Sequence, residues 1–186
     1  MKTVLLQPAV WICLVAFASG VAAGDEDDDP GGTLNPEEMT PSASLAKAIR
    51  GEVDMVTCSY GYLMHKTGAH ADARTIFEAC AAKGWTATMT WMAHMEDNAL
   101  GGRFDPQSAA EWDRRAAEAG DPLGLFHYGL HLLRGYGVAQ DIERGRAAID
   151  KAADAGLEVA VILRDSGYDP DIVISDADRR KSIDKN

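Results

Sequence analysis

The sequence predicts an all-α fold, an α-solenoid of about three helix-turn-helix repeats closed by helical caps. The first observation is a period of 36 residues: residues 151–156 (KAADAG) echo residues 115–120 (RAAEAG), and Asp141 echoes Asp105. A fixed period of roughly 20–50 residues is typical of stacked repeats rather than of one globular core. The second observation is that start and stop signals of helices recur within each period. Repeat arrays bind other molecules along an extended surface, so the period favours recognition over catalysis.

The unit at residues 121–156 shows the helix signals most clearly. Asp121-Pro122 predicts a helix start, because aspartate can cap free N–H groups and proline suits the first helical position. We expect this first helix, helix A of the unit, to run to about Arg134, where residues 135–138 (GYGV) break it. Asp141 then opens a second helix, helix B, which Gly156 ends. Small residues along helix B predict a close approach of its neighbour.

The N-terminal residues 1–23 have the composition of a cleavable signal peptide. A positive start at Lys2 precedes an apolar run over residues 10–18 and small residues at 21–23. We therefore expect export, to the periplasm or out of the cell, with no membrane insertion after cleavage. Retention of this segment as an anchor is the alternative, although the run is short for a membrane span. Residues 24–41 contain DEDDD and predict a disordered acidic lead-in.

The charge of the chain narrows the class of partner. Its 186 residues include 18 Lys and Arg against 29 Asp and Glu, which gives a formal net charge of −11 at pH 7. Nucleic acids and anionic membrane surfaces bind proteins through Lys and Arg side chains that neutralise phosphates. The charge therefore excludes nucleic acid as the expected partner.

Two cysteines remain once the predicted signal peptide, which contains Cys13, is removed. They are Cys58 and Cys80. An even number of cysteines in an exported chain favours a disulfide. Two buried free thiols are the alternative.

The unit at residues 121–156 resembles the Sel1-like repeat, a relative of the tetratricopeptide repeat. The matching residues are Tyr128-Gly129 in helix A, Gly135, Gly137, Val138 and Asp141 in the loop, and Lys151-Ala152-Ala153 with Gly156 in helix B. The resemblance implies a solenoid over residues 42–168, in units of about 52–87, 88–123 and 124–159. Residues 169–186 would form a C-terminal cap and tail. It also implies that a protein or peptide partner binds in the concave groove of the solenoid.

The first unit departs from the family pattern. Tyr60-Gly61 stands where Tyr128-Gly129 stands in the third unit, but 68 residues separate the two positions, four fewer than two periods. The turn at residues 66–70 (KTGAH) therefore lacks the full glycine loop. Antiparallel helices would bring Cys58 and Cys80 face to face, which resembles the cysteine-rich branch of the family, where helix pairs are clamped covalently.

The family register also implies which residues point into the groove. They lie on the stripe of helix A beside the buried one: Ser59, Leu63, Lys66, Trp91, Met95, Asn98, His127, His131 and Arg134. An exposed tryptophan beside Met and Arg is typical of a protein-binding hot spot. The alternative is that Trp91 packs between repeats. Trp112 takes the tryptophan position of helix B and is expected to be structural.

Two clusters carry atoms that could bind metal. His127 and His131 are four residues apart on one helix, and Met89 and Met95 lie near His94 and offer soft ligands suited to Cu(I). Two histidines without a third ligand do not make a zinc site. We therefore expect a methionine-rich core and surface histidines, without a metal. A periplasmic copper-binding protein that uses these Met and His residues is the alternative function.

Two strings resemble motifs of penicillin-recognising serine enzymes. Ser44-Leu45-Ala46-Lys47 fits S-x-x-K, and Lys66-Thr67-Gly68 fits K-T-G. The S-D-N motif is absent between them, and both strings fall in an expected helix or turn rather than on a strand. A β-lactamase-like hydrolase is therefore only the third candidate. The sequence shows no nucleophile paired with a base, so we predict a protein that is not an enzyme and has no cofactor.

Overall fold

The computed structural model describes residues 37 and 39–172, and these residues form helices and connecting turns with no strand. The helices are α1 (Pro41–Ile49), α2 (Met55–Lys66), α3 (His70–Ala82), α4 (Thr86–Asp97), α5 (Pro106–Glu118), α6 (Pro122–Arg134), α7 (Ile142–Asp154), α8 (Glu158–Asp165) and the 3-10 helix η1 (Pro170–Ile172). The predicted all-α class is confirmed. The predicted signal peptide, residues 24–36 of the predicted lead-in and residues 173–186 lie outside the described residues.

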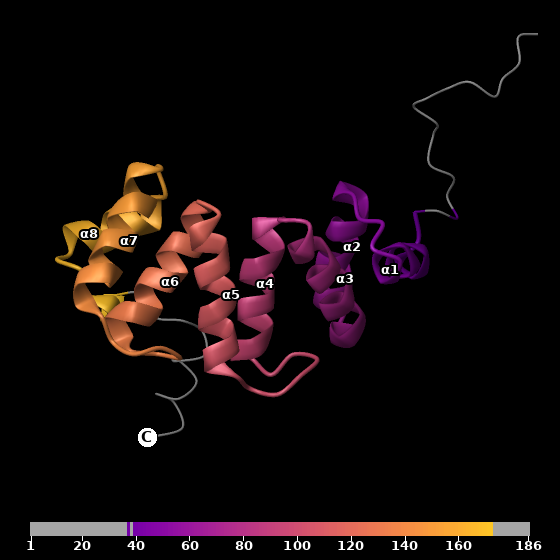
Figure 1. The fold of residues 1–186 in the computed structure, drawn as a ribbon, viewed down its shortest axis with the longest axis horizontal. Coiled ribbons are helices and arrows are strands. Elements are labelled where there is room, and N and C mark those ends of the chain that lie inside the picture. Colours follow the sequence, from indigo (N-terminus) through magenta and orange to yellow (C-terminus); the bar gives the residue numbers. More distant parts are fainter. Residues whose placement is uncertain (1–36, 38, 173–186) are drawn as a thin grey trace, which may run out of the picture. The chain divides into compact units, whose positions relative to one another are not determined.

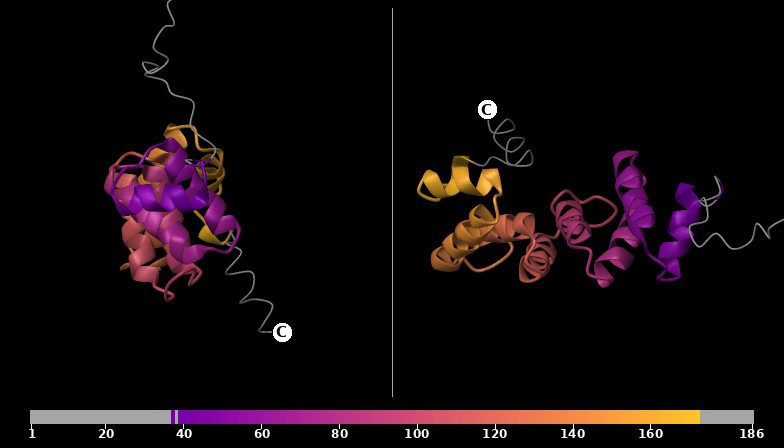
Figure 2. Two further views of the ribbon diagram at one scale, coloured as in Figure 1. Left: turned by 90° about the vertical axis from the view of Figure 1, so that its right-hand side faces the viewer. Right: turned by 90° about the horizontal axis from the view of Figure 1, so that it is seen from above.

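The helices pack in the order of the chain, from α1 to α8 (Figures 1 and 2). Three helix pairs, α2 with α3, α4 with α5 and α6 with α7, correspond to the three predicted repeats. Each pair packs against the next, α1 covers α2 and α3, and α8 covers α7. The predicted solenoid of three repeats with helical caps is therefore confirmed. Within residues 37 and 39–172, no helix is long and apolar enough to cross a membrane.

The end of every helix B repeats one hydrogen-bonded turn. The residues that leave the helix are Gly84, Gly120 and Gly156, with φ of 88°, 82° and 87°. Glycine suits this left-handed conformation because it has no Cβ to clash with the backbone. The next residue in each unit donates its N–H to the carbonyl five residues back, as in Asp121 to Ala116 at 3.1 Å and Leu157 to Ala152 at 3.1 Å. This turn explains the recurrent glycine of the 36-residue period.

The glycine loop between helices A and B rests on the preceding repeat. A Cβ on Gly137 would lie 2.0 Å from the carbonyl oxygen of Pro106, and a Cβ on Gly101 would lie 2.8 Å from that of His70. Each contact therefore joins a loop to the start of helix B one unit earlier. The first unit follows α1 rather than a helix pair. Its loop has no such support to reach, which is consistent with the shortened turn.

The helix starts agree with the sequence prediction. Side-chain oxygens of Asp54, Asp105 and Asp141 each accept the N–H three residues on, at 2.7, 3.0 and 3.0 Å. Asp121 accepts the N–H groups of Leu123 and Gly124, both at 2.9 Å. Such caps satisfy amide groups that have no partner inside the helix.

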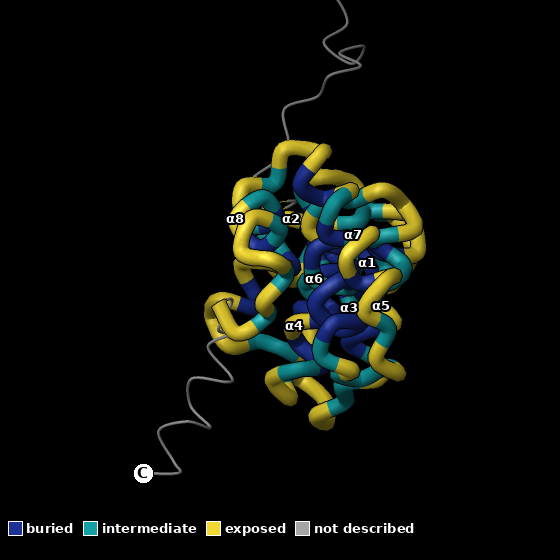
Figure 3. Tube along the Cα trace, turned by 90° about the vertical axis from the view of Figure 1, so that its left-hand side faces the viewer, coloured by how far each residue is buried: buried dark blue, intermediate teal, exposed yellow. Residues whose placement is uncertain are grey.

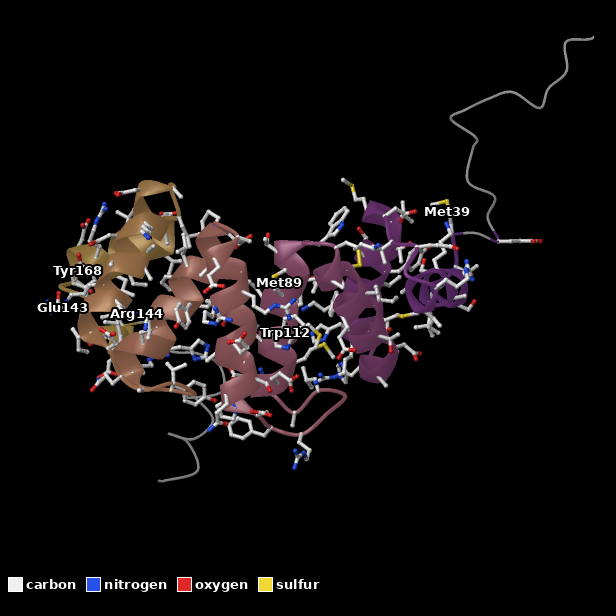
Figure 4. All side chains as sticks on the ribbon, in the orientation of Figure 1. Met39, Met89, Trp112, Glu143, Arg144 and Tyr168 are labelled. Atoms are coloured by element: carbon white, nitrogen blue, oxygen red, sulfur yellow. A yellow bond between two sulfur atoms is a disulfide. The ribbon has the colours of Figure 1, made fainter. Side chains whose placement is uncertain are left out.

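The core lies between the helices, where the buried parts of the chain gather (Figure 3). One cluster fills the first repeats around Phe77, and a second fills the last repeat around Ile149. A smaller cluster of Ala81, Met89 and Ala116 joins α3, α4 and α5, and Trp112 packs against it; Met89 and Trp112 lie close together in Figure 4. Arg115 covers the ring of Trp112 at 4.2 Å. Trp112 is therefore a packing residue, as the register predicts.

A disulfide joins Cys58 on α2 to Cys80 on α3, with an S–S distance of 2.06 Å. Both cysteines are buried in the cluster around Phe77. The predicted disulfide and the covalent clamp on the first helix pair are confirmed, and the alternative of two free thiols is wrong.

Candidate partner-binding face

The A helices α2, α4 and α6 carry eight of the nine residues that the sequence assigns to the groove, and the ninth, Asn98, is the C-cap of α4. The structure places some of them together on a surface centred on Trp91. We call this surface the Trp91 face and define it by the contacting residues Tyr62, Lys66, Trp91, His94 and Asn98. We add Leu63, which is exposed next to Tyr62 in the chain and one helical turn before Lys66. All of them belong to α2 or to α4 and its C-cap.

Trp91 is half-buried and has contacts on both sides. Its inner contact is Phe77, whose ring stacks on the indole at a centroid distance of 6.3 Å and an interplanar angle of 14°. Its outer neighbours are Tyr62 at 5.1 Å and His94 at 5.6 Å. Aromatic pairs of this geometry stabilise each other beyond their burial of area. Trp91 thus packs between the first two repeats and still contributes surface, so both interpretations of this residue hold in part.

The outer part of the Trp91 face combines apolar surface with one cation. The side chains of Tyr62 and Leu63 are 44% and 46% exposed. The Lys66 ammonium lies 5.4 Å from the centroid of the Tyr62 ring and 5.8 Å from that of Trp91. A cation over an aromatic face is attracted by the ring quadrupole. The lysine is thereby held beside the apolar surface.

Met95 and His131 do not lie on this surface, contrary to the groove register. Met95 is 0% exposed and His131 is 6% exposed. The cause is the glycine loop that follows each helix A, since Leu100 and Tyr136 donate their N–H groups to the carbonyls of Met95 and His131 at 2.9 and 3.0 Å. The loop residue therefore covers the helix end. In the first repeat the corresponding bond runs from Ala69 to the carbonyl of Met64 at 2.9 Å, and Met64 is buried while Leu63 is exposed.

His131 belongs instead to a buried polar network. Its Nε2 lies 3.1 Å from Oδ2 of Asp113 on α5, and its Nδ1 lies 2.9 Å from the carbonyl oxygen of Tyr136. His127 Nδ1 lies 3.6 Å from the other Asp113 oxygen. Asp97 accepts a hydrogen bond from the Tyr136 hydroxyl at 3.1 Å. The network thus connects α4, α5, α6 and the loop after α6.

The charges of this network follow from its geometry. Burial alone would lower the pKa of His131, but the hydrogen bond and the charge of Asp113 outweigh it and raise the pKa. Both ring nitrogens face oxygens that can only accept, so the protonated imidazolium fits the site. Burial raises the pKa of Asp97. The network binds the repeats together and offers His131 no surface for a partner.

Ser59 and Arg134 lie at other places on the A helices, whereas Asn98 belongs to the Trp91 face. Ser59 is exposed, and its hydroxyl donates to the carbonyl of Met55 at 2.8 Å. Asn98 donates its side-chain amide to the carbonyl of His94 at 2.8 Å. Arg134 donates to the carbonyl of Pro170 in η1 at 2.7 Å. Arg134 therefore connects α6 to the C-terminal cap.

Tyr62 and His94 are surface residues that the sequence argument missed. Tyr62 lies on α2 four residues before Lys66, His94 lies on α4 three residues after Trp91, and each contacts the Trp91 ring. The register takes its positions from the third unit, where the loop covers the helix end. The sequence signals that could have found them are an aromatic residue one helical turn before Lys66 and an imidazole one helical turn after Trp91.

The residues of the two alternative functions are not brought together. Met89 lies in the small cluster beside Trp112, whereas Met95 lies in the cluster around Phe77. Among the described residues, no group of three or more His, Cys, Asp or Glu side chains is placed to hold a metal ion. Ser44 of the S-x-x-K string is buried in α1, and Lys66 of the K-T-G string is exposed on the Trp91 face.

No family model and no curated protein matches the chain. Solved structures do match it. A Sel1 repeat protein from Oxalobacter formigenes is 31% identical with a TM-score of 0.52, and the match covers 55% of this chain and 42% of that protein. The chain thus spans about two fifths of the length of that relative.

Two further structures are similar at lower identity. The cysteine rich protein B of Helicobacter pylori is 17% identical with a TM-score of 0.54, over 68% of this chain and 98% of that one. A protective antigen of uropathogenic Escherichia coli with an SLR fold is 19% identical with a TM-score of 0.48, over 67% of this chain and 32% of that one. The structural neighbours are thus Sel1-like repeat solenoids, and they include a cysteine-rich protein.

Proposed function

We propose that this chain, which folds as a Sel1-like repeat solenoid, is a non-catalytic scaffold that binds a protein or peptide partner on its A helices. Sel1-like repeat proteins are generally protein-interaction scaffolds, and the neighbours of this fold are typically non-catalytic. A stack of helix pairs presents an extended surface and keeps it rigid through contacts between neighbours. Such a surface suits recognition.

The observation that carries the proposal is the Trp91 face. Tyrosine and tryptophan are among the residue types that dominate binding energy at protein interfaces. Here Tyr62, Trp91 and Lys66 lie within 6 Å of one another, beside the exposed Leu63. The disulfide and the phenylalanine stack beneath them hold these side chains in place before a partner arrives. Pre-organisation of this kind lowers the entropy cost of binding.

The proposed place of action is outside the cytoplasm. A disulfide persists in oxidising compartments, and the cysteine-rich neighbour agrees with such a location. The predicted signal peptide would deliver the chain there.

Site-specific photo-cross-linking tests the proposed function. A photoreactive residue at position 63, on the Trp91 face, should give a discrete adduct in cells that produce the chain. The matched control is position 78 on α3, where Glu78 is also exposed, with 51% of its side chain accessible. Adducts at position 78 alone, or equal adducts at both positions, would contradict the proposal.

A further inference from the structure

The Trp91 face carries a positive charge, that of Lys66, on a protein that is acidic as a whole. Lys66 is exposed, and within residues 37 and 39–172 no ion pair neutralises it. Its ammonium lies over the rings of Tyr62 and Trp91. The chain as a whole has a formal net charge of −11. Lys66 thus brings an unpaired positive charge to the exposed surface beside two aromatic rings.

The positive charge of Lys66 acts on two histidines, His65 and His94. Burial lowers the pKa of His94 and of His65, and the charge of Lys66 lowers both further. No carboxylate is among the groups that shift either histidine. The imidazoles are thus neutral at pH 7 and lie within a positive field. The face carries an unmatched positive charge.

The apolar part of the Trp91 face indicates that the partner also contributes an apolar side chain. Tyr62 and Leu63 expose nearly half of their side chains beside Lys66. An aliphatic or aromatic side chain would bury this surface, while a carboxylate beside it would pair with the ammonium. Charges that complement each other across an interface set specificity and orientation. One partner residue alone cannot supply both groups, so two neighbouring residues are required.

We propose that the Trp91 face binds a peptide segment in which an acidic side chain neighbours an aliphatic or aromatic one. The inference rests on the proposed function and names the chemistry of its partner. The acidic side chain pairs with Lys66, and its neighbour packs on Tyr62 and Leu63. Reversing the charge of Lys66 should therefore weaken binding by roughly tenfold or more, and a tenfold loss corresponds to about 1.4 kcal/mol.

A displayed library of random dodecapeptides tests this inference on the purified protein. Selected peptides should be enriched in Asp or Glu next to an aliphatic or aromatic residue. Fluorescence anisotropy then measures the tightest peptide, made with its acidic residue intact or replaced by lysine. Lys66→Glu should lose affinity for the acidic peptide and gain affinity for the lysine peptide, which also shows that the variant is folded. Lys83→Glu makes the same charge change at the C-cap of α3 and should leave both affinities unchanged.

The outcomes separate the inference from the proposed function. If the selected peptides lack acidic residues, or if Lys66→Glu and Lys83→Glu act alike, the inference fails. In that case loss of binding in Leu63→Asp would still support the face as the binding surface. If no peptide binds, or if binding survives both Leu63→Asp and Lys66→Glu, the inference and the proposed function are both contradicted.

Discussion

Asp113→Asn should destabilise the protein in a pH-dependent manner. Asp113 lies 3.1 Å from Nε2 of His131, whose Nδ1 lies 2.9 Å from the carbonyl oxygen of Tyr136. Both the aspartate and the histidine are buried. Because both partner oxygens only accept, His131 satisfies them only as the imidazolium. Asparagine keeps the volume of the side chain but removes the charge that stabilises this proton.

The expected loss of folding stability in Asp113→Asn follows from the hydrogen bond that is lost. A hydrogen bond to a charged group contributes about 1.5–3 kcal/mol. The amide of asparagine still offers an oxygen, so the loss should lie near the lower end, about 1.5–2 kcal/mol. Asp113→Ala also leaves Nε2 of His131 without a partner and should cost about 3–5 kcal/mol.

The pH dependence has a definite sign. The pKa of His131 is raised in the folded state. Its contribution is therefore fully present below the unfolded pKa of about 6.5 and is lost as the pH rises through the folded pKa. The pKa of Asp97 is also raised, so Asp97 likewise makes the folded state less stable as the pH rises. Because Asp97 is present in both the wild type and the variant, its effect cancels in the difference between them. The difference between wild type and Asp113→Asn should thus be larger in acid than in base.

Urea unfolding, followed by tryptophan fluorescence, measures this difference. Measurements at about pH 5.5 and about pH 9 bracket the usual histidine pKa of about 6.5. Asp154→Asn is the matched control, because Asp154 forms an exposed pair with Arg164, and it should cost less than about 1 kcal/mol. An equal loss at both pH values, or a larger one at pH 9, would refute the charged pair.

Three other predictions concern the stability of the repeats. Replacing Cys58 and Cys80 by serine opens a loop of 22 residues and should cost about 3 kcal/mol, measured against the oxidised protein in urea. Gly137→Ala should cost clearly more than Gly156→Ala, which costs about 1–2 kcal/mol for its left-handed conformation. The reason is that a Cβ at position 137 would clash with the backbone of Pro106, whereas a Cβ at position 156 would meet no atom. Equal shifts of the melting temperature in the two variants would contradict the contact between the loop and Pro106. Asp54→Ala should cost about 0.5–2 kcal/mol at neutral pH. The N–H of Thr57 lowers the pKa of Asp54, so this cost should vanish as the pH falls through that pKa, and persistence in acid would count against the cap.

Local signals made the helix pairs predictable from the sequence. Asp121 and Asp141 cap the helices that follow them, and Gly156 ends helix B, as their positions in the sequence predict. These features act within a few residues of the chain, so a single sequence displays them fully. The disulfide was equally predictable from the sequence, since its two cysteines lie on one helix pair.

The groove residues were less predictable because their exposure depends on contacts distant in the chain. His131 is buried by Asp113, which lies 18 residues earlier on α5. Met95 is buried beneath Leu100, which belongs to the loop and not to the helix. The 36-residue register assumes that equivalent positions have equivalent surroundings. The shortened first repeat breaks this assumption. Leu63, which the register equates with the buried Met95, is exposed.

Hydroxyl-radical footprinting tests the central claim that partners bind the Trp91 face. The side chains would be labelled with and without the partner captured through position 63. We expect the bound partner to protect Tyr62 and Leu63 strongly from labelling. Phe104 and Ile142, which are 54% and 38% exposed elsewhere on the chain, should be labelled as before. Protection of Phe104 or Ile142, with Tyr62 and Leu63 labelled as before, would contradict the claim.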